Sequence, residues 1–313
     1  MEPSLCNGTL DVVFWALDGL AGTAILAGNL FTCIVLISSP ALRKNYMNVF
    51  LLSLAISDTL MAILVAPGLA AFCDRCCENT MTKHCWVLTS VAEISFLAVI
   101  LNLLAICYDR YMAVFKPLHY NLRMNKQHVL KVLLLVWGIP PLVALGRLTF
   151  GPSSNAHDNL HMNLVITIVF VFIPILILVL VNGMITRAIR KHRQRIHSFK
   201  SEIFSETLTA EAAREVQRNT WRKRRSGTMS CVLVSMVFVC CWLPRAFYNI
   251  NFTMNIPPAS RPLFAKLSML LVLTQSFLNP CIYTVYRVEF RRAAKRVVEQ
   301  VIARIQSALW SLS

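Results

Sequence analysis

Isolated charged and amide side chains interrupt several long apolar stretches of this sequence. Asp58 and Glu93 are each the only charged residue of an apolar run, and Asn279 begins a polar motif that ends at Tyr283. A carboxylate removed from water needs a cation, a proton or hydrogen bonds. The chemistry that suits such residues is the binding of an ion or a ligand inside a largely apolar environment.

The elements that position these residues are too apolar for a soluble protein. Of 313 residues, 56% are hydrophobic and 15% are charged, and the mean hydropathy is +0.58. A soluble globular protein carries about 25% charged residues. The composition therefore excludes a soluble enzyme, a disulfide-rich secreted module and a disordered chain.

Seven apolar runs are each long enough to cross a bilayer, which takes roughly 20 residues for ~30 Å of hydrocarbon. They lack the alternating pattern of barrel strands. The first run is too long for the apolar segment of a signal peptide and lacks the basic residues that precede such a segment. We therefore expect an all-α membrane protein, a seven-transmembrane helix bundle within residues 12–286. The expected spans are 12–37, 49–72, 86–108, 132–148, 164–185, 229–250 and 263–286.

Lys and Arg residues gather in four segments outside the spans. Segments 38–48, 109–131, 187–228 and 287–313 hold 2, 5, 12 and 6 of them. Cytoplasmic loops carry such an excess, so we expect a multi-pass plasma-membrane protein with an extracellular tail at 1–11 and a cytoplasmic C-terminus. The third cytoplasmic loop is then 187–228, in which 201–217 has helix-forming composition. The net charge of +16 favours membrane lipid and an acidic cytoplasmic partner, with no nucleic acid.

Cysteines of the outer side are candidates for disulfides, because disulfides persist in an oxidising compartment. Their number is odd, so at least one stays free or pairs between molecules, and zinc is a less favoured alternative for the three close together. The outer tail also holds a glycosylation sequon at Asn7. The disulfide candidates are Cys6, Cys73, Cys76, Cys77 and Cys85.

Short motifs occur in chain order along the spans. They include Gly28-Asn29, Ser57-Asp58, Asp109-Arg110-Tyr111, Pro174, Phe238 with Trp242-Leu243-Pro244, and Asn279-Pro280 with Tyr283. With this set the chain resembles rhodopsin-like (class A) G-protein-coupled receptors, and within them adenosine and melanocortin receptors. The resemblance implies a receptor, not an enzyme. It would bind an extracellular ligand and activate a heterotrimeric G protein through outward movement of the sixth span. A transporter or channel is the alternative, against which the absence of an evident repeat speaks.

The resemblance also implies roles for individual residues. Asp58, Ser276 and Asn279 are similar to an allosteric sodium site, the only cofactor expected; the alternative is a protonated Asp58 bonded to Asn279. Arg110 would pair with Asp109 at rest. The coupling and activation residues that the family motifs imply are Asp109, Arg110, Tyr111, Ile100, Pro174, Phe238, Pro244, Asn279, Pro280 and Tyr283.

Two departures from the family pattern concern the cytoplasmic side. Residues 222–225 are all basic, so no acid near the base of the sixth span tethers Arg110, and Asn182 stands where a tyrosine is usual. The asparagine puts the bridge to Tyr283 that the resemblance implies in doubt. Because the tether of Arg110 is missing, we expect raised signalling without ligand. After the seventh span, apolar residues alternate with basic ones, which predicts a short amphipathic helix lying in the membrane interface, followed by a tail, within 287–313.

The outer pocket is expected around Glu93, which lies about 12 Å deeper than Cys85 at 1.5 Å per residue. Glu93 either pairs with Arg245 or anchors a basic group of the ligand. Phe247 is expected in the same cavity, next to a loop at 149–163 that has no cysteine. The candidate ligand-binding residues are Glu93, Trp242, Arg245, Tyr248, Asn249 and Asp18.

Overall fold

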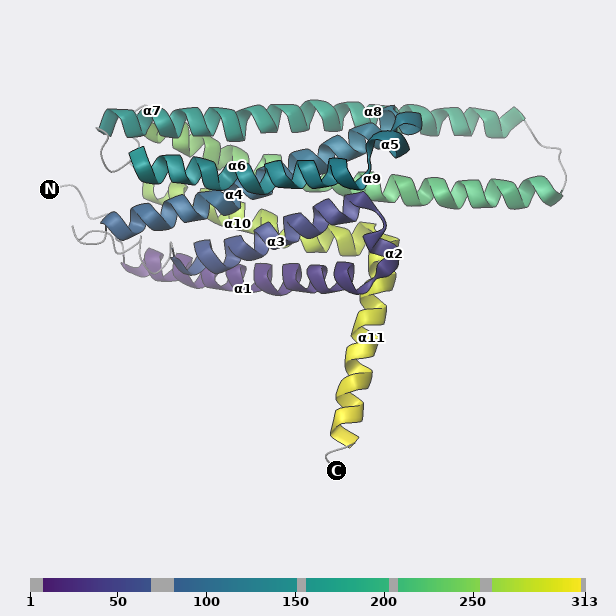
Figure 1. The fold of residues 1–313 in the computed structure, drawn as a ribbon, viewed down its shortest axis with the longest axis horizontal. Coiled ribbons are helices and arrows are strands. Elements are labelled where there is room, and N and C mark those ends of the chain that lie inside the picture. Colours follow the sequence, from purple (N-terminus) through teal and green to yellow (C-terminus); the bar gives the residue numbers. More distant parts are fainter. Residues whose placement is uncertain (1–7, 69–81, 151–155, 203–207, 254–260, 311–313) are drawn as a thin grey trace.

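A computed structural model describes residues 8–68, 82–150, 156–202, 208–253 and 261–310, and these are almost entirely helical. The long helices lie side by side in one bundle (Figure 1). In chain order they are α1 (Gly8–Ser38), α3 (Tyr46–Gly68), α4 (Thr82–Phe115), α6 (Lys126–Phe150), α7 (Ala156–Thr167) with its continuation α8 (Ile173–Glu202), α9 (Leu208–Thr253) and α10 (Arg261–Tyr286). Short helices α2 (Pro40–Arg43) and α5 (Pro117–Arg123) join them, and α11 (Val288–Trp310) follows.

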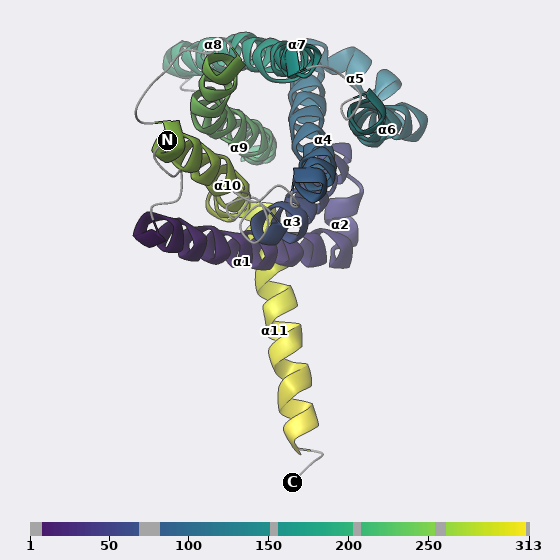
Figure 2. The same cartoon turned by 90° about the vertical axis from the view of Figure 1, so that its left-hand side faces the viewer.

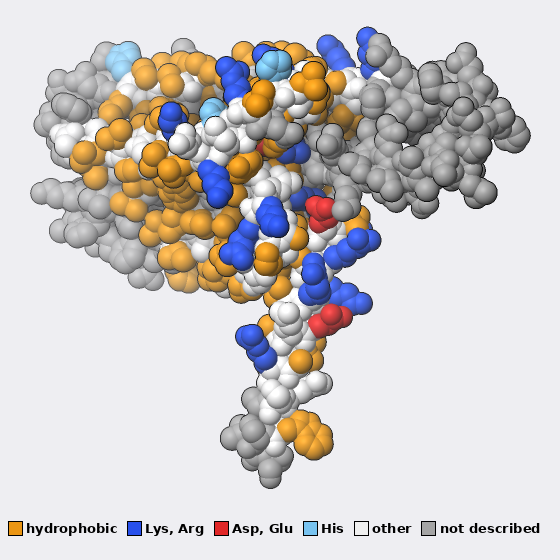
Figure 3. Space-filling view, turned by 45° about the vertical axis from the view of Figure 1, so that its right-hand side comes forward, with side chains coloured by type: hydrophobic (Ala, Val, Ile, Leu, Met, Phe, Trp, Pro, Cys, Tyr) orange, Lys and Arg blue, Asp and Glu red, His pale blue; other side chains and the backbone are white. Residues whose placement is uncertain are grey.

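Seven of these helices are long and apolar enough to cross a membrane, as expected. The segments are Val12–Ser38, Tyr46–Leu64, Ser90–Phe115, Lys126–Thr149, His161–Lys191, Ser226–Asn251 and Leu263–Tyr286. Leu134, Leu142 and Leu176 each expose more than half of their surface on the outside of the bundle. Figure 3 shows hydrophobic side chains covering the flank of the bundle, with Lys and Arg along the first turns of α11. This is the surface of a helix bundle embedded in lipid.

Helices α1, α3, α4, α7 with α8, α9 and α10 form a ring around the interior, seen along the bundle in Figure 2, and α6 packs outside it against α4. One polar contact orients α6, because Trp137 Nε1 donates to Ser53 Oγ of α3 at 2.9 Å. The interior of the ring holds a buried core that includes Leu54, Ile100 and Phe238. This core separates a cavity at one end of the bundle from a cluster of charged residues at the other. We call these the outer cavity and the cytoplasmic end, after the orientation that the basic segments predict.

The fifth span departs from the sequence-based expectation. Most of the predicted loop at 149–163 is helix, since α7 begins at Ala156. Between α7 and α8 lies η2 (Ile168–Phe172), a π-helical turn in which the Ile173 N–H bonds the Ile168 carbonyl. Pro174 cannot donate a backbone hydrogen bond, and its ring crowds the carbonyl four residues earlier. The wider π turn before Pro174 relieves that clash without breaking the helix.

The cytoplasmic extensions also differ from a plain loop at 187–228. Helix α8 continues to Glu202 and α9 begins at Leu208, which agrees with the helix-forming composition of 201–217. Helix α11 begins one residue after α10 and leaves the bundle at a steep angle (Figure 1). Its first turns pack on the core through Phe290 and Ala293. The expected helix after the seventh span is therefore present.

Candidate functional site

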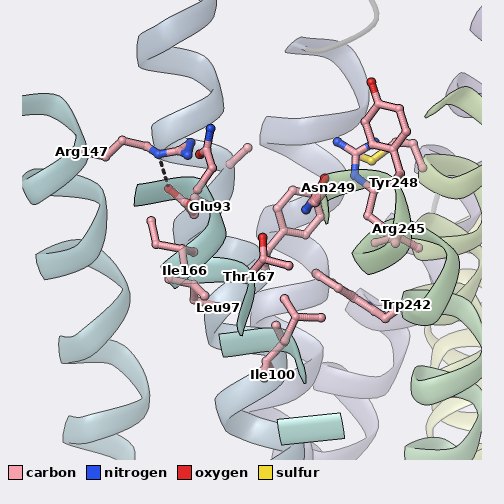
Figure 4. A pocket seen from close by; sticks show the side chains of 16 residues that line it. Glu93, Leu97, Ile100, Arg147, Ile166, Thr167, Trp242, Arg245, Tyr248 and Asn249 are labelled. Atoms are coloured by element: carbon pink, nitrogen blue, oxygen red, sulfur yellow. Dashed lines mark ion pairs between the residues drawn. The ribbon is translucent and has the colours of Figure 1, made fainter. Parts of the chain in front are cut away.

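The outer cavity lies among α4, α6, α7, η2, α9 and α10 and has a volume of about 400 Å³. Trp242 forms part of its wall on the side of the core, as Figure 4 shows. Its ring contacts Phe96 edge-on, with centroids 5.5 Å apart, and Phe238 at 5.3 Å. The cavity is lined by Ala92, Glu93, Phe96, Leu97, Ile100, Arg147, Asn163, Ile166, Thr167, Val171, Trp242, Arg245, Tyr248, Asn249, Met269 and Val272.

Glu93 pairs with Arg147 of α6, and the expected pair with Arg245 is wrong. Arg147 Nε lies 3.2 Å from Glu93 Oε2, and each side chain is about one-seventh exposed. Arg147 is the partner because α6 packs directly on α4, whereas Arg245 occupies the opposite wall of the cavity (Figure 4). Arg147 belongs to the functional residues that the sequence did not reveal.

Arg245 lines the cavity with aromatic and polar neighbours. Its guanidinium lies 5.1 Å from the ring centroid of Tyr248, and Nη1 is 3.5 Å from the Ala265 carbonyl oxygen. Asn249 lies one turn further along α9 and also lines the cavity. The structure thus brings Glu93, Trp242, Arg245, Tyr248 and Asn249 together around one space.

Two other residues expected there lie elsewhere. Asp18 of α1 and Phe247 of α9 do not line this cavity, and Phe247 is 57% exposed on the outside of the bundle. Phe247 follows Arg245 by two positions, which turns it to another face of the helix. Asn163 and Thr167 also line the cavity but were not singled out from the sequence. Asn163 was expected in a loop at 149–163, and Thr167 is one hydroxyl within an apolar run.

Asp58 is buried in the centre of the bundle and accepts two hydrogen bonds from α10. Ser276 Oγ donates to its Oδ1 at 2.6 Å, and Asn279 Nδ2 donates to its Oδ2 at 2.8 Å. Asn29 Nδ2 donates to the Ser276 carbonyl at 3.2 Å. The side-chain oxygens of Asn29 and Asn279 are buried with no donor among the described residues. A carboxylate with spare amide oxygens beside it is the donor set that hard cations take, so these residues fit a sodium ion.

At the cytoplasmic end Arg110 pairs with the preceding Asp109. Arg110 Nε donates to Asp109 Oδ2 at 2.8 Å, and Nη2 contacts the same oxygen. Tyr120 of α5 donates its hydroxyl to Asp109 Oδ1 at 2.8 Å. Burial and the adjacent Asp109 raise the pKa of Tyr120, so its hydroxyl stays a donor near neutral pH. Tyr111 faces away from this network, with its ring 5.0 Å from that of Phe115.

The cytoplasmic ends of the helices are closed around this network. Ser226 of α9 donates to the Tyr286 carbonyl of α10, and Cys231 of α9 contacts Met47 of α3 with the sulfurs 3.6 Å apart. Asn182 Nδ2 and Tyr283 OH are both buried and have no partner among the described residues. No bridge links α8 to Tyr283 here, in keeping with the asparagine at 182.

Arg287 is a buried arginine at the junction of α10 and α11 that sequence reasoning did not single out. It is 4% exposed, and its Nη2 donates to Asn48 Oδ1 of α3 at 2.6 Å. Burial lowers the pKa of Arg287, and the positive charge of Arg110 acts in the same direction. Two guanidinium groups therefore share the closed cytoplasmic end of the bundle.

The remaining motif residues lie along the helices that join the two ends. Ile100 and Phe238 are fully buried in the core, and Pro174 is buried directly after the π turn. Pro244 lies within α9 and Pro280 within α10. Asn7, Cys6, Cys73, Cys76 and Cys77 lie outside the described residues, and the side chain of Cys85 does too.

Residues 28–283 match the family described as 7 transmembrane receptor (rhodopsin family). The histamine H2 receptor of Cavia porcellus is 27% identical over 273 residues, which span 86% of this chain and 74% of that receptor. The adenosine receptor A2a of Homo sapiens is 27% identical over 314 residues, which span 92% of this chain and 72% of that receptor. A D(5)-like dopamine receptor of Takifugu rubripes is also 27% identical, over 86% of this chain and 63% of its own length. The expected likeness to adenosine receptors is confirmed, and a likeness to amine receptors accompanies it.

Proposed function

Because the chain belongs to the rhodopsin family of seven-transmembrane receptors, we propose that the outer cavity receives its extracellular ligand and that α9 transmits the signal to a heterotrimeric G protein. The observation that carries this proposal is that one helix, α9, contacts both the ligand cavity and the cytoplasmic end of the bundle. Trp242 of α9 borders the cavity, while Ser226 and Cys231 of α9 close the cytoplasmic side.

The geometry suggests how a bound ligand acts. Pro244 lies between the cavity-lining residues Trp242 and Arg245 and removes a backbone hydrogen bond within α9, which weakens the helix at the level of the cavity. A ligand that binds better when Trp242 and Phe238 have shifted favours the conformation in which the lower part of α9 tilts outward. That tilt breaks the contacts of Ser226 and Cys231 and uncovers Arg110 for the G protein.

The test of this function is G-protein activation in cells that express the receptor, measured without ligand and with a ligand screen. Arg110→Ala should abolish the signal while the receptor still reaches the surface. Arg292→Ala, which removes an exposed arginine of α11, is the matched control and should retain it. A signal that survives Arg110→Ala would contradict the proposed coupling role.

Sodium at Asp58 is a second part of the proposal, supported by the spare oxygens of Asn29 and Asn279. When bound, the ion supplies the positive charge that the buried carboxylate lacks among the described residues. Ser276 and Asn279 hold Asp58 in place from α10. Since α10 also carries Pro280 and Tyr283, a charge held here favours the closed bundle. Protonation of Asp58 remains the competing hypothesis.

The plasma membrane, with the N-terminus outside, is the location that we propose. Its support is the Lys and Arg excess in the segments that follow the first, third, fifth and seventh spans. The apolar face of α11 should then lie in the cytoplasmic leaflet, where Val301, Ile302, Ile305 and Trp310 are exposed away from the bundle. Epitope tags at either end, read on intact and permeabilised cells, test the orientation. A cytoplasmic N-terminus would contradict it.

A further inference from the structure

The outer cavity carries one more positive than negative charge. Its lining holds one carboxylate, Glu93, and two guanidinium groups, Arg147 and Arg245. Glu93 is already compensated by Arg147 at 3.2 Å, in a pair whose side chains are mostly buried. A basic ligand would have to compete with Arg147 for the Glu93 carboxylate, and breaking a mostly buried ion pair is costly. The cavity therefore does not favour the basic ligand that the sequence suggested.

Arg245 carries the excess charge. Among the described residues no carboxylate lies within ion-pair distance of it. Its recorded contacts are the ring of Tyr248 and, at 3.5 Å, the Ala265 carbonyl. Neither neighbour neutralises a cation, and a partly buried guanidinium without a counter-charge gains from an anion that accepts its hydrogen bonds. Figure 4 shows Arg245, Tyr248 and Asn249 together on the wall opposite Glu93.

The rest of the lining is apolar or aromatic. Phe96 and Trp242 offer ring surfaces, and Leu97, Ile100 and Val171 continue the apolar wall. Trp242 Nε1 is buried with no acceptor among the described residues. The volume of about 400 Å³ lies near the small end of the range of ligand pockets, about 300–1,000 Å³. The space suits a small molecule with an apolar body and one anionic end.

We infer that the ligand is a small organic acid whose carboxylate binds Arg245 and whose aromatic or alkyl body packs against Phe96 and Trp242. This inference rests on the proposed use of the cavity as the ligand site. Tyr248 and Asn249 border the carboxylate position, and the Trp242 N–H is available to an acceptor on the ligand body. The Glu93–Arg147 pair forms the opposite wall and has no net charge. It therefore offers no free cation to a second carboxylate, which favours a monoacid over a diacid.

Matched probes can test the charge preference on the full-length receptor in nanodiscs. One set is indole-3-acetate, indole-3-acetamide and tryptamine, and a second is decanoate, decanol and decylamine. Binding is read as a rise in the thermal unfolding midpoint and by titration calorimetry. We expect at least one of the two acids to bind, and the amine of the same set to bind at least about tenfold more weakly.

Variants assign the effect to Arg245. Arg245→Gln should weaken acid binding by at least about tenfold, whereas Arg245→Lys should keep part of it. Lys266→Gln is the matched control. It removes a cation that belongs to α10 and lies outside the cavity lining, and this variant should bind acids as the wild type does. Glu93→Gln should leave acid binding unchanged or stronger, because Arg147 then lacks its partner. If Arg245→Gln does not fold, Arg245→Lys with Glu93→Gln still decides between an acid and an amine.

Three results would overturn the inference: stronger binding of the amines, acid binding that Arg245→Gln leaves intact, or no binding of either acid at millimolar concentration. Each is read without a G protein. A receptor that binds no acid and yet shows Arg110-dependent G-protein activation therefore refutes only the acid ligand. A receptor that binds acids and activates no G protein refutes only the proposed function.

Discussion

The side chain of Arg147 reaches from α6 across to Glu93 of α4 and ends 3.2 Å from its carboxylate. The pair joins the helix that packs outside the ring to the wall of the outer cavity. The Tyr108 and His128 rings, with centroids 5.8 Å apart, join the same two helices further along. The Glu93–Arg147 pair also decides which charge of the cavity is left for a ligand.

Breaking the Glu93–Arg147 pair should destabilise the receptor. Glu93→Gln or Arg147→Gln removes one member of a largely buried ion pair. We expect the free energy of unfolding to fall by about 1–3 kcal/mol, which is less than for a fully buried pair because both side chains keep some exposure. Thermal unfolding of the purified receptor measures it. The double variant should lose less than the sum of the single losses. Strictly additive losses would contradict a direct interaction.

Much of the fold could be predicted from the sequence, because lipid imposes long apolar runs and the basic segments set their order. Each of the seven expected spans overlaps a membrane-spanning helix, although the helix of the fifth begins earlier than expected. The helix after Tyr286 was expected from its amphipathic pattern. The π turn at 168–172 was not expected, since Pro174 alone does not reveal whether a helix kinks, stops or widens. The second outer loop was predicted too long for a different reason, because α7 begins at Ala156, within the polar stretch before the apolar run.

The candidate site was only partly predictable. Asp58 could be grouped with Ser276 and Asn279 because the chain resembles class A receptors, in which the motifs that hold these residues form one site. The partner of Glu93 could not, because the choice between Arg147 and Arg245 depends on how α6 and α9 are rotated about their axes, and nearly uniform apolar helices carry little information on that rotation. Arg287 was missed for a similar reason, since one more arginine in a basic segment gives no sign of being buried.

The resting network around Asp109 should respond to a single hydroxyl. Tyr120→Phe removes the donor to Asp109 Oδ1, which weakens the position from which Asp109 holds Arg110. A hydrogen bond to a charged group contributes roughly 1.5–3 kcal/mol, of which part is lost on activation, so ligand-free signalling should rise roughly two- to tenfold. G-protein dissociation in cells, normalised to surface expression, measures it. Tyr111→Phe is the control, because Tyr111 packs on Phe115 outside this network.

Signalling of the unmodified receptor without ligand should exceed that of untransfected cells. The physical reason is that residues 222–225 offer no carboxylate to hold Arg110 in the resting state. The same G-protein assay, with receptor expression varied over a wide range, should show a signal that grows with the amount of receptor. A flat response at the level of untransfected cells would refute this prediction.

Sodium should stabilise the receptor through Asp58. Replacing sodium by N-methyl-D-glucamine at constant ionic strength should lower the thermal unfolding midpoint of the wild type, because the buried carboxylate then lacks a counter-ion. Asp58→Asn should abolish this dependence. Asp18→Asn, which changes a carboxylate of α1 outside the cluster, should retain it. A wild type that is indifferent to sodium would favour a protonated Asp58 held by Asn279.

The contact between Gly28 and Pro280 should be intolerant of any added side chain. A Cβ at position 28 would lie 3.2 Å from Pro280 Cγ, so α1 and α10 approach closely only because residue 28 is glycine. Gly28→Ala should lower the thermal unfolding midpoint, at a cost of about 1–3 kcal/mol for overpacking. Gly183→Ala is the matched control, because a Cβ there meets nothing within 4 Å. With the better helix propensity of alanine, it should be neutral or stabilising by up to about 1 kcal/mol. Equal effects of the two substitutions would show that the Gly28 contact does not limit the packing of α1 on α10.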